Sequence, residues 1–67
     1  MVNFTDLLLQ FRKDNALTQK EMAQRLGWTP MYYGRFENGN LTPTKRNIEK
    51  FSNVLNIPVT ELLKYTK

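Results

Sequence analysis

The side chains best suited to chemistry in this chain are Met31, Tyr32 and Arg35, which fall within five residues of one another. A guanidinium such as that of Arg35 can bond guanine O6 and N7 together, the commonest specific contact between a protein and a base. Met31 offers an apolar surface that suits a thymine methyl group, and Tyr32 can reach a phosphate or stack on a sugar. Together these side chains could contact the bases and backbone of a nucleic acid.

The segment from residue 19 to residue 38 must position these side chains, and it is predicted to form two short helices joined by a tight turn. Small Ala23 falls where the two helices would cross, and Gly27 falls at the turn. The apolar residues recur at helical spacing: Met22, Leu26, Trp28, Tyr33 and Phe36. This is the pattern of a helix-turn-helix, whose second helix lies in the major groove of DNA with its first turns against the base edges.

The rest of the chain is predicted to add three more helices and no strand, because no segment alternates apolar and polar residues for long enough. A first helix is expected over residues 4–14, with Phe4, Leu8 and Phe11 on one stripe. Thr18 and Glu21 predict a capping box at the start of the second helix, and Thr29-Pro30 opens the third. Thr42-Pro43 repeats that pattern and predicts the start of a fourth helix, which ends near residue 56, and a short fifth helix follows Pro58.

Composition narrows the possible functions. The chain has 67 residues, which predicts a single domain over 1–67, and it contains no cysteine and no histidine. Its acidic residues show no metal-ligand spacing, and neither an activated nucleophile nor a phosphate-binding glycine loop is present, so we expect no enzyme, metal or cofactor. No apolar run is long enough for a membrane span, and we expect a cytoplasmic protein. The net charge of +4 is compatible with a phosphate-backbone partner.

The stretch from Leu17 to Leu63, LTQKEMAQRLGW…RFENGN…P…IPVTELL, resembles the phage repressor and Cro (XRE-like) family of helix-turn-helix proteins. The first helix fits as well, so the resemblance covers nearly the whole chain. It implies an all-α fold, a compact five-helix lambda-repressor-like DNA-binding domain. It also implies binding of double-stranded DNA operators as dimers, with one subunit on each half-site.

The resemblance further implies which residues touch DNA. Base contacts are expected from Gln19, Met31, Tyr32 and Arg35. Phosphate contacts are expected from residues near the helix starts and the loop after the third helix: Arg12, Thr18, Thr29, Asn38, Asn40, Lys45 and Arg46. Arg12 and Glu37 occupy the positions of a partly buried ion pair that joins the first helix to the third. Dimer contacts are expected from residues 41–44 and 57–59.

Two departures from the family pattern concern the predicted recognition helix. Pro30 replaces a residue that is often a polar base reader, and Gly34 lies inside the helix. The favoured function is a sequence-specific transcriptional regulator, Cro-like or repressor-type, that binds a palindromic operator as a weak homodimer. The alternative is a protein-interaction module, antitoxin-like or anti-repressor-like, with weak or no DNA binding. Arg35 and Tyr32 favour the first, whereas Pro30, Met31 and Gly34 dilute the polarity of this face.

Overall fold

The computed structural model describes residues 3–66, which form five α-helices and no strand. The elements in chain order are α1 (Phe4–Asp14), α2 (Gln19–Leu26), α3 (Pro30–Glu37), α4 (Lys45–Leu55), α5 (Val59–Leu62) and a closing 3-10 turn, η1 (Leu63–Tyr65). The predicted all-α, five-helix architecture with a helix-turn-helix is therefore confirmed. Within the described range, no helix is long and apolar enough to cross a lipid bilayer.

The helix-turn-helix, α2 and α3, has the ends that its sequence predicts. The Thr18 hydroxyl accepts from the Glu21 N–H at 3.1 Å, and the Glu21 carboxylate accepts from the Thr18 N–H at 3.0 Å, which completes the capping box. Gly27 ends α2 with φ +77°, a left-handed conformation that a side chain would strain. The Thr29 hydroxyl then accepts from the Tyr32 N–H at 3.2 Å and caps α3. The turn is thus set by local chemistry.

The predicted start of the fourth helix is wrong by two residues. The cap of α4 is Thr44, not Thr42: its hydroxyl accepts from the Asn47 N–H at 3.3 Å, and the Asn47 side chain accepts from the Thr44 N–H at 3.0 Å. Pro43 is buried instead of occupying the first turn, and it lines a surface hollow together with Phe4 and other residues. The reciprocal Thr44–Asn47 cap, combined with burial of the proline, accounts for the shift.

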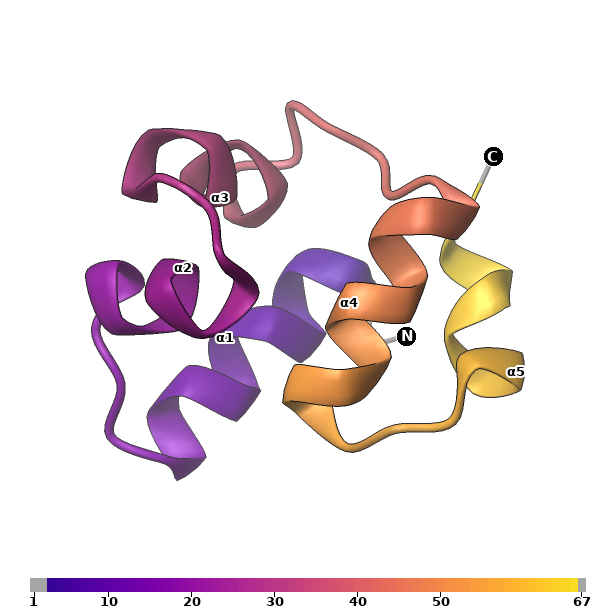
Figure 1. Ribbon diagram of the computed structural model, residues 1–67, viewed down its shortest axis with the longest axis horizontal. Helices are drawn as coiled ribbons and strands as arrows, with labels where there is room; N and C mark the ends of the chain where they lie inside the picture. The colour runs from indigo at the N-terminus through magenta and orange to yellow at the C-terminus, as the bar shows by residue number, and fades with distance from the viewer. Residues whose placement is uncertain (1–2, 67) are drawn as a thin grey trace.

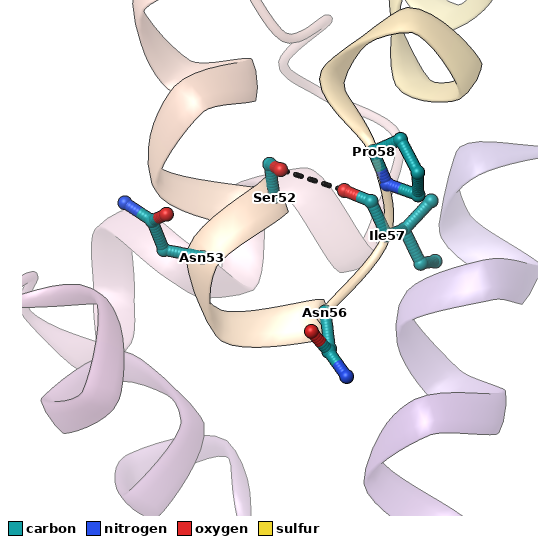
Figure 2. A pocket seen from close by; sticks show the side chains of 5 residues that line it. All are labelled: Ser52, Asn53, Asn56, Ile57 and Pro58. Atoms are coloured by element: carbon teal, nitrogen blue, oxygen red, sulfur yellow. Dashed lines mark hydrogen bonds between the residues drawn. The ribbon is translucent and has the colours of Figure 1, made fainter.

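The end of α4 agrees with the prediction. Asn56 ends the helix in the left-handed conformation, with φ 58°. Figure 2 shows the turn that follows, where the Ser52 hydroxyl donates a hydrogen bond of 2.6 Å to the Ile57 carbonyl. These residues, with Asn53 and Pro58, line a shallow surface hollow. The turn therefore orders residues 57–58 ahead of α5.

The core lies where all five helices meet. In Figure 1, α4 stands between the α2–α3 pair and α5. The ring of Phe51, on α4, has its centroid 4.8 Å from that of Phe4 and 5.3 Å from that of Phe36, so it joins α1 and α3. The buried apolar residues are Phe4, Leu8, Met22, Ala23, Leu26, Tyr33, Phe36, Ile48, Phe51, Leu55 and Leu62. This core holds the inner face of α3 and leaves the opposite face to solvent.

Candidate nucleic-acid interface

The outer face of α3 gathers three of the four residues expected to read bases. Met31, Tyr32 and Arg35 are exposed, and with Thr29 they line one shallow hollow, the α3 hollow. Met31 is 74% exposed, which is unusual for a large apolar side chain in a helix. Arg35 forms no ion pair with any residue between 3 and 66. The α3 hollow thus combines a free cation with an apolar and an aromatic surface.

The inner face of α3 is held by aromatic packing. Tyr33 and Phe36 are buried, as the helical spacing predicts. Trp28, in the turn, is only partly buried, and its ring stacks on that of Phe36 with centroids 5.4 Å apart. The Tyr32 ring meets the Trp28 ring edge-on at 4.9 Å, so one residue of the α3 hollow rests directly on the turn. Packing of this kind fixes the rotation of α3 about its axis.

The carboxyl-terminal end of α3 is anchored by a polar group that we call the Glu37 cluster: Arg12, Gln19, Tyr33 and Glu37. The Arg12 Nε lies 2.6 Å from Glu37 Oε2, and Arg12 Nη2 donates to Glu37 Oε1 at 3.0 Å. The Tyr33 hydroxyl also donates to Oε2, and Gln19 Nε2 donates to Oε1 at 2.9 Å. The cluster therefore joins α1, α2 and α3 at one buried carboxylate.

Electrostatics agree with this geometry. Burial by itself raises the pKa of Glu37, but hydrogen bonds from Arg12, Tyr33 and Gln19 outweigh it and hold the pKa below its usual value. Burial, followed by the hydrogen bond to Glu37, raises the pKa of Tyr33 well above its usual value. At neutral pH, Glu37 is therefore an ion that only accepts hydrogen bonds, and Tyr33 is a neutral donor to it.

The residues expected to contact phosphates lie on several elements. Thr18, Thr29 and the pair Lys45–Arg46 lie at the amino-terminal ends of α2, α3 and α4, and all are exposed. Asn38 and Asn40 are exposed between α3 and α4. Arg12 differs from the others, because it uses three N–H groups within the protein, two toward Glu37 and one toward the Leu17 carbonyl at 3.0 Å.

Two features of this region were not predicted from the sequence. The Gln19 side chain, expected only as a DNA contact, reaches across to Glu37, and a Cβ on Gly34 would lie 3.9 Å from Gln19 Oε1. Lys50, on α4, donates to the Leu26 carbonyl at the end of α2 at 3.2 Å and lies over the Trp28 ring. Residue type and spacing carry no signal for either contact, because each joins different helices.

The described residues hold no cluster of side chains suited to a metal ion.

Comparison with known proteins identifies the family of this chain. The helix-turn-helix family HTH_3 matches residues 8–62. The chain is 36% identical over 61 residues to the uncharacterized HTH-type transcriptional regulator YqaE of Bacillus subtilis (strain 168), covering 91% of this chain and 53% of that protein.

A second relative from the same organism is the SPbeta prophage-derived uncharacterized HTH-type transcriptional regulator YonR, 35% identical over 63 residues that cover 94% of this chain and 58% of that protein. The chain thus spans a little over half the length of these curated relatives. Among solved structures, the clp gene regulator ClgR from C. glutamicum shares the fold, with a TM-score of 0.72 and 22% identity over 92% of this chain and 80% of that one. The chain belongs to the HTH_3 helix-turn-helix family of phage repressor and Cro type, a family of DNA-binding transcriptional regulators and not of enzymes.

Proposed function

We propose that this chain binds a palindromic DNA operator as a weak homodimer and regulates transcription by occupying that site. The observation that carries the proposal is the contrast across α3, whose inner face is buried while Met31, Tyr32 and Arg35 remain exposed around the α3 hollow. A helix held rigidly on one side, with a free cation on the other, suits insertion into the major groove. The names of both Bacillus subtilis relatives support a role in transcription.

Base reading falls to the α3 hollow and to Gln19. Arg35 has a free guanidinium and can bond guanine O6 and N7 together. Met31, the most exposed large apolar side chain between residues 3 and 66, suits a thymine methyl group. Tyr32, fixed by its contact with Trp28, can meet a base edge or the adjoining sugar. Gln19 opens α2 beside α3 and reaches the same groove.

Phosphate contacts would orient the protein on the duplex. Free N–H groups at the amino-terminal ends of α2 and α3, beside Thr18 and Thr29, suit phosphate oxygens. Lys45 and Arg46 add positive charge at the start of α4, and Asn38 and Asn40 add amide donors before it. Arg12 has guanidinium N–H groups beyond the three used within the protein, and these can reach a further phosphate.

Dimer contacts would come from residues 41–44 and 57–59. The second segment begins in the turn of Figure 2, and Val59, the first residue of α5, is 37% exposed. A palindromic operator matches such an arrangement, because a two-fold dimer places its two recognition helices on half-sites one helical turn apart.

The test selects binding sites from a random duplex pool and titrates the winning site at two salt concentrations. We expect an enriched palindrome and a steep salt dependence. Arg35→Ala should relax the preference at one base position by about 1–3 kcal/mol, whereas Lys45→Ala should weaken binding to all sequences uniformly. Lys64→Ala, an exposed charge on η1, is the matched control and should change neither.

The same experiment tests the alternative function. Weak binding without any enriched sequence would contradict the proposal and favour a protein-interaction module on this fold. An enriched site without two-fold symmetry would support sequence-specific DNA binding but contradict binding as a homodimer.

A further inference from the structure

We propose that Glu37 fixes the orientation of the Gln19 carboxamide, so that Gln19 presents its carbonyl oxygen to the major groove and selects a base with an exocyclic amino group, adenine first. The inference rests on the proposed function, since it concerns which base one side chain of that interface prefers. It assigns Glu37 the part of a positioning residue for DNA specificity, in addition to its ion pair with Arg12.

The hydrogen bonds at Glu37 leave no choice about which end of the Gln19 amide faces it. Oε1 of Glu37 accepts from Arg12 Nη2 at 3.0 Å and from Gln19 at 2.9 Å, and Oε2 accepts from Arg12 Nε at 2.6 Å and from the Tyr33 hydroxyl. A carboxylate accepts and never donates, so the atom of Gln19 at 2.9 Å must be its nitrogen. A flipped amide would place two oxygens against each other and leave the buried carboxylate one donor short.

Gly34 lies beside the Gln19 amide. The Gln19 side chain crosses from α2 to the far end of α3, and it passes over the α-carbon of Gly34. A Cβ at residue 34 would lie 3.9 Å from Gln19 Oε1 and 4.0 Å from Nε2, so the amide lies flat against the helix at this point. A longer side chain at that position would displace the amide from Glu37.

The oxygen of the Gln19 amide and one of its two N–H groups are therefore left to interact. Gln19 is exposed, and no group between residues 3 and 66 donates a hydrogen bond to its Oε1. Adenine N6 and cytosine N4 are the hydrogen-bond donors that bases present in the major groove, whereas guanine and thymine present acceptors there. Phosphate oxygens only accept, so they cannot bond this atom. Adenine is preferred because the second N–H of the Gln19 amide can reach its N7 while Oε1 accepts from N6.

The first arm of the test compares wild-type protein with Gln19→Met in site selection from a random duplex pool. Methionine has nearly the same length and no hydrogen-bonding amide. We expect one position in each half-site to prefer adenine, then cytosine, with about 5- to 150-fold discrimination that Gln19→Met abolishes while the other positions persist. A preference for guanine or thymine there, or a uniform loss of affinity without any Gln19-dependent position, would overturn the inference.

The second arm changes the DNA, so it uses only folded wild-type protein and Gln19→Met. Adenine at the identified position is replaced by purine, which lacks the N6 amino group. Wild-type protein should lose most of its preference for the site, and Gln19→Met should bind both duplexes equally. Equal binding of both duplexes by the wild-type protein would contradict the contact from Oε1.

The third arm tests Glu37 itself with Glu37→Gln, whose neutral amide can face Gln19 with either an oxygen or a nitrogen. The preference for adenine should shrink although Gln19 is present, while Lys13→Ala, which removes an exposed charge on α1 outside the Glu37 cluster, should retain it. A folded Glu37→Gln protein with unchanged base preference would refute the positioning role; if it fails to fold, the first two arms decide. Selection without any enriched sequence would remove the proposed function itself, whereas an enriched site lacking the adenine position removes this inference alone.

Discussion

The two faces of α3 differ in how their polar groups are satisfied. At the buried end, Glu37 accepts four hydrogen bonds from Arg12, Gln19 and Tyr33. On the outer face, Arg35 has no ion-pair partner within residues 3–66, and Met31 is 74% exposed. The polar groups at the carboxyl-terminal end of α3 are hydrogen-bonded within the protein, whereas Arg35 on the outer face is available to a binding partner. Substitutions in the Glu37 cluster should therefore lower the free energy of unfolding, whereas substitutions at Met31 or Arg35 should lower DNA affinity with little effect on stability.

Among the substitutions that compare the two regions of α3, Arg12→Ala should give the largest effect, because it leaves the buried Glu37 carboxylate without its cation. We expect a loss of about 3 kcal/mol in the free energy of unfolding, the lower end for a broken buried pair, since the Arg12 side chain is 22% exposed. Urea unfolding followed by circular dichroism measures it. The matched control is Lys13→Ala, which removes an exposed charge next along α1; similar losses in both variants would show that the pair does not stabilise α3. DNA affinity should fall with Arg12→Ala, because the same pair orients α3.

Acid should weaken the same end of α3. The pKa of Glu37 is lowered in the folded protein, so its contribution to stability is complete above its unfolded value of about 4.5 and is lost as the pH falls below that value. Unfolding free energies measured between pH 7 and pH 3 should show this decline.

The comparison that isolates Glu37 is Glu37→Gln, which should be less stable at pH 7 and decline less steeply in acid. The wild-type protein must be compared with this variant because the pKa of Glu21 is lowered as well, by its hydrogen bonds with Thr18, and Glu21 also contributes to the loss of stability in acid. Parallel pH curves for the wild-type and Glu37→Gln proteins would assign the acid sensitivity to other carboxylates.

Gly34→Ala should have a smaller effect, and it should stabilise the protein. Glycine inside a helix costs up to about 1 kcal/mol relative to alanine, and the new Cβ would make only ordinary contact with the Gln19 amide at 3.9 Å. Thermal unfolding should show a higher midpoint. Gly27→Ala is the control of opposite sign, because φ +77° strains any side chain at that position. A lower midpoint for Gly34→Ala would mean that the amide cannot accommodate the methyl group.

Met31→Ala should have the smallest effect on stability, within about 0.5 kcal/mol, because the side chain has few contacts to lose. Met22→Ala, which truncates a fully buried methionine on α2, should cost about 2–5 kcal/mol in the same urea experiment. Affinity for the selected operator should nevertheless fall with Met31→Ala at the position where it meets a thymine methyl. Substantial destabilisation by Met31→Ala would place this residue in the fold instead of the interface.

Most helix ends could be predicted because their signals are local. Thr18, Gly27 and Thr29 act on N–H groups or backbone angles within a few residues, so the order of residues is sufficient. The same reasoning was wrong at Thr42-Pro43, where two threonines offered alternative caps. Burial of Pro43 and the partnership of Thr44 with Asn47 decided between them. The capping rule therefore failed where Thr42 and Thr44 were both possible caps of α4.

The residues of the interface also include some whose placement could be predicted from the sequence and some whose contacts could not. The apolar spacing together with the family resemblance predicts that Tyr33 and Phe36 face inward and that Met31, Tyr32 and Arg35 lie on the outer face. The partner of Gln19 could not be predicted, because Gln19 and Glu37 are 18 residues apart and on different helices. Lys50 and the Leu26 carbonyl are 24 residues apart and meet only because α4 packs against α2.

Local sequence is sufficient for most helix ends, for the left-handed turn at Gly27 and for the apolar face of α3, since each depends on interactions within one or two turns of chain. Packing between helices, by contrast, set the partners of Gln19 and Lys50. Glu37 becomes the hub of three helices, and the Gln19 amide is oriented by it, because a buried carboxylate must gather its donors from whatever elements the core brings within reach.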